Sequence, residues 1–248
     1  MYTLSKILCL PLCFLLYASE TIADDRCGQD NQDLSYIYHL GGKSEGRIPF
    51  EKELSSLLIE QSAGKFGKLD ISFNEKAISP GRAREELRKG LHLHFLTGGI
   101  IDRKTDEDLA FILENPILHN FLGYRQLLVK KERLAEFESI SSWTELLELT
   151  AGQATQWPDV KILEGAGIRV VQGDSYHSLF PMLHHNRFDY LPLGAGEIYG
   201  SLENETKFKE NFAIVKNIVI YYPWPIYYFV SRTCPSLFHR INYSMDKI

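Results

Sequence analysis

The chain has 248 residues, with 27 Lys and Arg against 32 Asp and Glu, and its formal net charge at pH 7 is −5. A mildly acidic chain without a tract of Lys or Arg argues against nucleic acid as a partner. No apolar run reaches the roughly 20 residues that a membrane-spanning helix needs, because Pro223 and Pro225 interrupt the stretch 218–230.

The first 23 residues are predicted to be a cleavable signal peptide. Lys6 precedes the apolar run 7–17, and Thr21-Ile22-Ala23 supplies small residues at the third and first positions before a cut. The alternative is an uncleaved anchor, which the short apolar run disfavours. The sequence therefore predicts export.

The next hundred residues alternate between strand and helix patterns. Hydrophobic alternation and the i, i+3, i+4 spacing of leucines distinguish the two types of element. The expected order is strand 34–39, a helix around 54–58, strand 69–73, helix 80–89 and strand 91–95.

The second half continues with a strand at 124–129 and a capping box at Ser142 and Glu145 before a helix that Gly152 ends. A run of short elements follows. They are helix 158–164, strand 168–171, a helix after Asp174 and Ser175, strand 188–191, strands 212–215 and 218–222, strand 227–230 and helix 235–245.

This alternation predicts mostly parallel sheets. Ligands bind such sheets at the carboxyl ends of the strands. Trp157 and Glu197 stand where a helix follows a predicted strand or glycine-rich turn. We therefore expect both residues near a bound small molecule.

Several motifs recur here in the order of a known family. They are Trp157-x-Asp159, then Tyr176-x-x-Leu179-Phe180-x-Met182-Leu183, then Arg187-Phe188-Asp189-Tyr190, flanked by Leu122-Gly123-Tyr124-Arg125 and by the segment 222–230. The chain resembles a divergent branch of the bacterial family-3 extracellular solute-binding proteins, which have the periplasmic-binding-protein type II fold. The resemblance implies an α/β protein of two lobes, each an open, mostly parallel sheet flanked by helices, with two hinge crossings. Lobe 1 would comprise 24–120 and the return segment 221–248, and lobe 2 would comprise 121–220.

The resemblance also implies a function. A periplasmic, non-catalytic and monomeric protein would capture a small polar solute, such as an amino acid, for an ABC-type transporter. No cofactor is expected, and a membrane permease or a sensor would be the partner. Two alternatives remain: an enzyme on the same fold, with Glu197 as acid or base, and a ligand-sensing module for a signalling partner.

Five residues are the candidate ligand contacts. A zwitterionic solute needs a cation for its carboxylate and an acid for its ammonium group. Arg82 and Arg103 follow strands of lobe 1 and could supply the cation, and Glu197 could supply the acid. Trp157 could stack on the solute, and Tyr124 lies at the hinge.

Each candidate also has a structural interpretation. Both arginines could be solvated surface residues, and Trp157 could be a packing aromatic of lobe 2. Arg125, beside Tyr124, could brace the hinge. The branch often has Arg where Leu193 stands, and this difference weakens an assignment to an anionic solute.

Cysteine and histidine give weaker signals. Cys27 and Cys234 remain after cleavage, and the periplasm would allow them to form a disulfide. His92 and His94 share one face of a predicted strand, but no third ligand accompanies them, so no metal site is expected.

Overall fold

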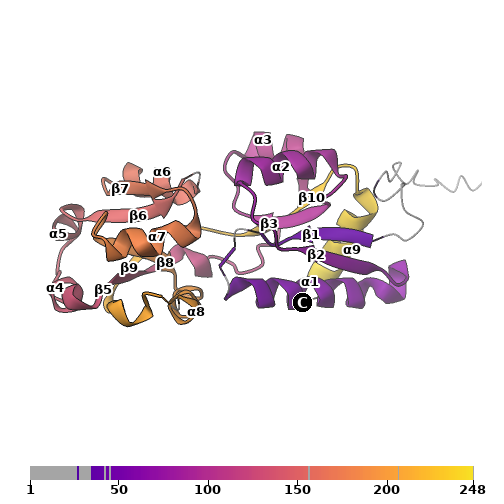
Figure 1. The fold of residues 1–248 in the computed structure, drawn as a ribbon. Coiled ribbons are helices and arrows are strands. Elements are labelled where there is room, and N and C mark those ends of the chain that lie inside the picture. Colours follow the sequence, from indigo (N-terminus) through magenta and orange to yellow (C-terminus); the bar gives the residue numbers. More distant parts are fainter. Residues whose placement is uncertain are drawn as a thin grey trace, which may run out of the picture.

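The computed structural model describes residue 27, residues 35–41, 43–44, 46–155, 157–205 and 207–247. The predicted signal peptide lies outside these residues. Two five-stranded sheets, each covered by helices, form two lobes that lie side by side (Figure 1). No helix in the described part of the chain is long and apolar enough to span a membrane.

Lobe 1 contains the first four strands and the last one. These strands are β1 (Ser35–His39), β2 (Asp70–Asn74), β3 (Phe95–Gly98), β4 (Ala110–Ile112) and β10 (Tyr227–Ser231), in the sheet order β2-β1-β3-β10-β4. Strand β1 pairs in parallel with β2 and β3, whereas β10 is antiparallel to β3 and β4. The helices are α1 (Arg47–Phe66), α2 (Pro80–Lys89), α3 (Arg103–Leu109) and α9 (Pro235–Met245).

Lobe 2 repeats this plan. Its strands are β5 (Tyr124–Lys130), β6 (Thr150–Ala154), β7 (Arg169–Gly173), β8 (Tyr190–Gly194) and β9 (Phe212–Tyr221), in the order β7-β6-β8-β5-β9. Strand β6 is parallel to β7 and β8, and β5 is antiparallel to β8 and β9. The helices are α4 (Leu134–Glu138), α5 (Trp143–Leu147), α6 (Pro158–Gly165), α7 (Tyr176–His184) and α8 (Ile198–Asn204), with short 3-10 turns at Phe121–Gly123, Lys131–Arg133 and Lys209–Asn211.

The chain crosses between the lobes twice, from β4 to β5 and from β9 to β10 (Figure 1). The two crossing segments touch, because the Tyr222 amide donates to the Gly123 carbonyl at 3.2 Å. A Cβ atom on Gly123 would lie 2.1 Å from the Tyr222 carbonyl oxygen, so the close approach requires glycine there. The architecture is the predicted two-lobed fold with two hinge crossings. Each sheet is mixed rather than mostly parallel, because the strands next to the crossings run antiparallel to their neighbours.

Each sheet has an apolar core on both faces, as the period-two alternation of buried strands requires. In lobe 1, Tyr228 packs toward α1 and α9, whereas its neighbour Phe229 packs toward α2. In lobe 2, Leu127 and Leu128 divide in the same way between two clusters.

The structure joins Cys27 and Cys234 in a disulfide, with their Cα atoms 5.2 Å apart. Cys234 is the residue before α9, and both cysteines lie in the core cluster beneath α1 and α9. The bridge therefore fastens the start of the described chain to its last helix.

Four predicted boundaries are wrong. Strand β3 begins at Phe95, since Leu91 is 61% exposed and lies in the preceding turn. Gly152 does not end a helix but lies within β6, where a Cβ would stand 2.2 Å from the Phe188 ring. Strand β8 begins at residue 190, two residues after the predicted start. The two strands expected within 212–222 form the single strand β9.

Candidate functional site

A charged cluster lies at the end of lobe 1 that faces lobe 2, where β1 and β3 end and α1 begins. It comprises Tyr38, Lys43, Arg47, Glu51 and Thr97, here called the lobe 1 charge cluster. Arg47 is the first residue of α1, and Glu51 lies one turn later on the buried face of that helix. Thr97 comes from the carboxyl end of β3.

Glu51 is the centre of the cluster and is fully buried. Arg47 Nε donates to Glu51 Oε1 at 2.5 Å, and Lys43 Nζ lies 3.2 Å from Oε2. The Tyr38 hydroxyl also donates to Oε2, as does Thr97 Oγ1 at 2.7 Å. A buried carboxylate with this many donors is a fixed anchor for the two cations around it.

Burial and the neighbouring charges shift the pKa values of three groups at the cluster. Burial opposes ionisation of Glu51, but Arg47 and Lys43 outweigh it and lower its pKa to about 2. Burial lowers the pKa of Lys43 to about 8, against the opposing effect of Glu51. Burial and then the charge of Lys43 lower the pKa of His39 to about 4, so that imidazole is neutral.

Glu197 reaches this cluster from lobe 2. It follows the turn after β8 and is the residue before α8. Ser44 Oγ donates to Glu197 Oε1 at 3.0 Å, and Arg47 Nη1 lies 3.9 Å from the same oxygen. The acid therefore interacts with the opposite lobe at the start of α1. The ribbon of α8 lies beside that end of α1 (Figure 1).

Two glycines allow this contact between the lobes. A Cβ on Gly200, in α8, would lie 3.3 Å from the Cα of Gly46, just before α1. The backbones of α8 and of the segment before α1 therefore approach closely beside the Glu197 contact. The interlobe junction, defined by Ser44, Gly46, Arg47, Glu197 and Gly200, is thus closely packed.

The two predicted arginines lie elsewhere on lobe 1. Arg82 is exposed near the start of α2, and its side chain forms no ion pair with another described residue. Arg103 begins α3 with its side chain 49% exposed and pairs with Glu107 and Glu114 at 2.8 and 2.9 Å. Neither arginine forms a hydrogen bond or ion pair with the described residues of lobe 2.

The aromatic candidates lie at the ends of lobe 2 elements. Trp157 precedes α6, after the carboxyl end of β6, and packs against the core cluster with its ring 6.3 Å from that of Tyr176. Tyr124 is 47% exposed at the start of β5 and contacts the Tyr221 ring at 4.7 Å. Trp157 therefore follows the carboxyl end of a strand and Tyr124 begins one at the hinge, and each has an aromatic neighbour.

Arg125 braces the hinge from within. It is buried, and its Nη2 lies 2.8 Å from Asp159 Oδ1, on α6. The Tyr222 hydroxyl donates to the same oxygen at 2.5 Å, and the Arg125 guanidinium lies over the Tyr222 ring. This triad ties α6 and the second crossing segment to β5.

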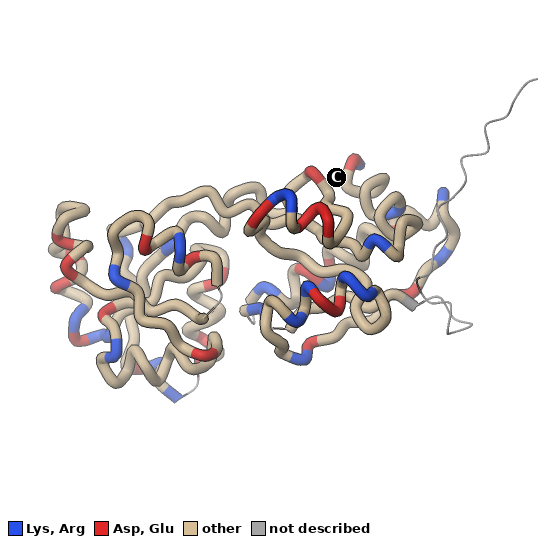
Figure 2. Tube along the Cα trace, turned by 90° about the horizontal axis from the view of Figure 1, so that it is seen from above, with Lys and Arg blue, Asp and Glu red and all other residues tan. Residues whose placement is uncertain are grey.

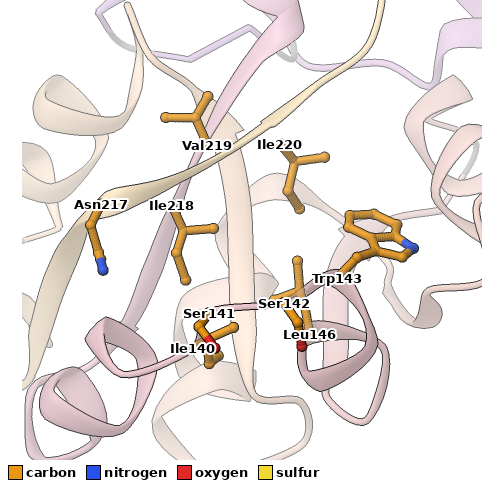
Figure 3. Close-up of a pocket in the computed structure, with 9 residues that line it drawn as sticks. All are labelled: Ile140, Ser141, Ser142, Trp143, Leu146, Asn217, Ile218, Val219 and Ile220. Atoms are coloured by element: carbon orange, nitrogen blue, oxygen red, sulfur yellow. The ribbon is translucent and has the colours of Figure 1, made fainter.

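Two hollows of the described residues lie away from the interlobe junction, one between α1 and β2 of lobe 1 and one on lobe 2. A hollow of about 260 Å³ lies between the start of α5 and the second half of β9, with Trp143 and Asn217 in its lining (Figure 3). None of its lining residues is charged. No group of three His, Cys, Asp or Glu side chains in the described residues could hold a metal ion.

The sequence placed Glu197 after a strand, where the structure finds it, but did not single out Lys43, Arg47 or Glu51. One signal was available, since Glu51 stands three and seven residues before Leu54 and Leu58, on the apolar stripe of the helix. A carboxylate on a buried stripe needs a partner. Arg47 stands four residues before it, at the spacing for an ion pair.

Comparison with known proteins identifies the fold. No protein-family model matches the chain, and no curated protein matches it. A Salmonella typhimurium periplasmic binding protein with high arginine specificity is similar in structure, with a TM-score of 0.61, 16% identity and coverage of 86% of this chain and 92% of that one. The holo arginine-binding protein of T. maritima is also similar, with a TM-score of 0.62, 13% identity and coverage of 86% of this chain and 89% of that one.

The substrate-binding protein of an amino acid ABC transporter is similar too, with a TM-score of 0.60, 12% identity and coverage of 86% of this chain and 92% of that one. The chain therefore has the two-lobed fold of the periplasmic amino-acid-binding proteins.

Proposed function

We propose that the protein is a periplasmic solute-binding protein, which captures a small polar solute between its two lobes and presents it to an ABC-type transporter. The observation that carries this proposal is the interlobe junction, where an acid of lobe 2 meets a cationic group of lobe 1. Strand ends and helix starts from both lobes converge there, which is where open α/β sheets bind ligands. The similar structures named above are themselves binding proteins.

In this proposal Glu197 binds the ammonium group of an amino acid or a related solute. Trp157 and Tyr124 contribute from lobe 2 and the hinge, and Arg82 and Arg103 are the cations that the sequence suggests on lobe 1. The protein acts as an exported monomer after removal of residues 1–23, and its partner is a membrane permease. Basic and acidic positions are interspersed over both lobes, a surface that does not favour nucleic acid (Figure 2).

Native mass spectrometry of protein purified without refolding tests this function. Binding proteins that enclose their solute can retain it, so we expect one small-molecule adduct per chain, which is released on denaturation. Returning the recovered molecule to refolded protein should raise the melting temperature through binding to the native state. A wild-type protein that carries no adduct and that no small polar solute stabilises would contradict the proposal.

The same experiment separates binding from catalysis. A binding protein leaves the recovered molecule unchanged after prolonged incubation. Chemical conversion of that molecule, lost on Glu197→Gln, would instead support an enzyme on this fold.

A further inference from the structure

We propose that Trp224 sets the angle between the two lobes, because its ring is wedged between the core of lobe 2 and Gly99 of lobe 1. Trp224 lies in the second crossing segment, 222–226, which connects β9 to β10 (Figure 1). This inference concerns a conformational device of the hinge and goes beyond the proposed function. Only its effect on solute affinity rests on that function.

The second crossing segment is stiff because of its composition. Its sequence is Tyr222-Pro223-Trp224-Pro225-Ile226. The ring of each proline fixes the φ angle of that residue, and the residue before a proline is confined to extended conformations. Residues 222–225 are therefore all restricted, and the segment resists bending.

Both ends of this segment are fastened. The Tyr222 hydroxyl donates to Asp159 Oδ1, on α6 of lobe 2, at 2.5 Å. At the other end, the Ile226 carbonyl accepts from the amide of Ile117, which follows β4 of lobe 1, at 2.8 Å. Ile226 is also buried. The central residue, Trp224, is therefore held in one position between the lobes.

The Trp224 ring contacts both lobes. On lobe 2 it packs against the core cluster that contains Ile220 and Tyr222. On lobe 1 it lies so close to Gly99 that a Cβ atom there would be 2.6 Å from Trp224 Cζ2 and 2.8 Å from Cη2. Carbon atoms in contact lie about 3.5–4.0 Å apart, so glycine leaves the room that the ring needs. We call this contact between Trp224 and Gly99 the Trp224 seat.

The lobe 1 side of the Trp224 seat is firmly held. Gly99 is the residue after β3, and its carbonyl accepts from Arg84 Nη2 at 3.2 Å. Arg84 Nε pairs with Asp106 at 3.1 Å, and this buried acid also accepts from the Ile101 amide at 2.8 Å. Helices α2 and α3 thus fix the loop after β3. Because the loop and the crossing segment are both fixed, the ring between them limits how far the lobes rotate about the hinge.

The seat also affects binding in a solute-binding protein. Apparent affinity falls when the arrangement that binds the solute is only partly populated. The Trp224 seat favours the arrangement in which Glu197 of lobe 2 contacts Ser44 of lobe 1. Trp224 is therefore a positioning residue, which acts on affinity through the angle between the lobes.

Pulsed electron paramagnetic resonance on solute-free protein tests the seat. Nitroxide labels attached at Glu60→Cys on α1 and Glu164→Cys on α6, both exposed positions, report the distance between the lobes. We expect a narrow distance distribution for the otherwise wild-type protein. Gly99→Ala adds the methyl group that the ring excludes, and the ring or the lobe must retreat by about 1 Å at the hinge to restore a normal contact. The mean distance between the labels should therefore shift by about 2 Å or more, since they lie far from the hinge.

Gly98→Ala is the matched control, one residue earlier in the same loop. A Cβ atom on Gly98 would lie 3.8 Å from its nearest neighbours, an ordinary contact, so this variant should give the wild-type distribution. Trp224→Leu alone should broaden the distribution, because the seat is lost. Adding Trp224→Leu to Gly99→Ala removes the clash and should return the mean distance toward that of the wild type. Melting temperatures show that each variant is folded.

The affinity is measured with the molecule recovered from the wild type by native mass spectrometry. We expect Gly99→Ala to bind it about 10-fold more weakly, which corresponds to a 10-fold lower population of the binding arrangement. Gly98→Ala should stay within about twofold of the wild type, because its added methyl meets no close neighbour.

The outcomes separate this inference from the proposed function. If Gly99→Ala or Trp224→Leu leaves the distance distribution unchanged, the inference is wrong and the proposed function stands. An equal shift in Gly98→Ala would also overturn the inference. If the distances change as expected but no solute is ever recovered or bound, the hinge device is supported and the proposed function is wrong.

Discussion

At the residue scale, Glu51 is the side chain whose chemistry the structure constrains most. Its carboxylate is buried and accepts hydrogen bonds from Tyr38, Arg47 and Thr97. Removal of one member of such a buried network leaves the other charges without compensation. The glutamate therefore holds the loop after β1 to the end of β3.

We expect Glu51→Gln to lower the free energy of unfolding at pH 7 by about 3 kcal/mol. The pKa of Glu51 is about 2 in the folded protein against an ordinary 4.5, so its stabilising effect is complete above pH 4.5 and is lost as the pH falls through 2. The difference between wild type and variant should therefore shrink from pH 7 to pH 3, as measured by urea unfolding. Glu53→Gln, on the exposed face of α1, is the control, and an equal effect of both variants would contradict the assignment.

Asp159 is the corresponding anchor in lobe 2. Asp159→Ala leaves Arg125 buried without its partner and removes the acceptor of the Tyr222 hydroxyl. We expect a loss of about 3–5 kcal/mol in chemical unfolding. Asp174→Ala, at an exposed position before α7, should change stability by less than about 0.5 kcal/mol. If Asp159→Ala changed the free energy of unfolding as little as the control does, the buried pairing of Arg125 with Asp159 would be contradicted.

At the element scale, the disulfide is the clearest target. Cys27 and Cys234 are 207 residues apart in sequence, and a cross-link over so long a loop restricts the unfolded chain strongly. We expect the double variant Cys27→Ser/Cys234→Ser to lose about 2–5 kcal/mol. Its melting temperature should fall by roughly 5–15 °C.

Reduction provides the control for this prediction. Dithiothreitol should lower the melting temperature of the wild type to that of the double variant and leave the variant unchanged. A wild type that does not respond to the reductant would contradict the presence of the bridge.

The sequence predicted most elements because each carries its own periodicity. Helix α2 begins and ends at the predicted residues, Pro80 and Lys89. Ser79 is its N-cap, and Gly90 after it has left-handed backbone angles. The errors arose where tertiary packing overrides local pattern. Leu91 extends an apolar alternation without being buried, and Gly152 looks like a helix terminus although it is there to accommodate the Phe188 ring.

The site was only partly predictable for a related reason. Glu197 could be identified because a glycine-rich turn after a strand presents it at a sheet end. Arg47 and Glu51 match an ordinary surface ion pair at i, i+4 spacing, and only their packing against Tyr38 and Thr97 makes them special. That packing joins residues up to 59 positions apart.

At the scale of the whole molecule, two features define the relation between the lobes. The crossing segments are fastened to each other at Gly123 and Tyr222. At the junction, Glu197 contacts Ser44 while Gly200 packs near Gly46. A two-lobed protein with paired hinge strands can open and close around a ligand at such a junction.

Hydrogen exchange followed by mass spectrometry tests this account most directly, by comparing solute-free protein with the same protein reloaded with the molecule recovered from it. We expect bound solute to slow exchange in two segments that are distant in sequence, 43–52 at the start of α1 and 194–202 at the start of α8. Slower exchange confined to 140–146 and 217–220, the hollow between α5 and β9, would place the solute elsewhere and contradict binding between the lobes.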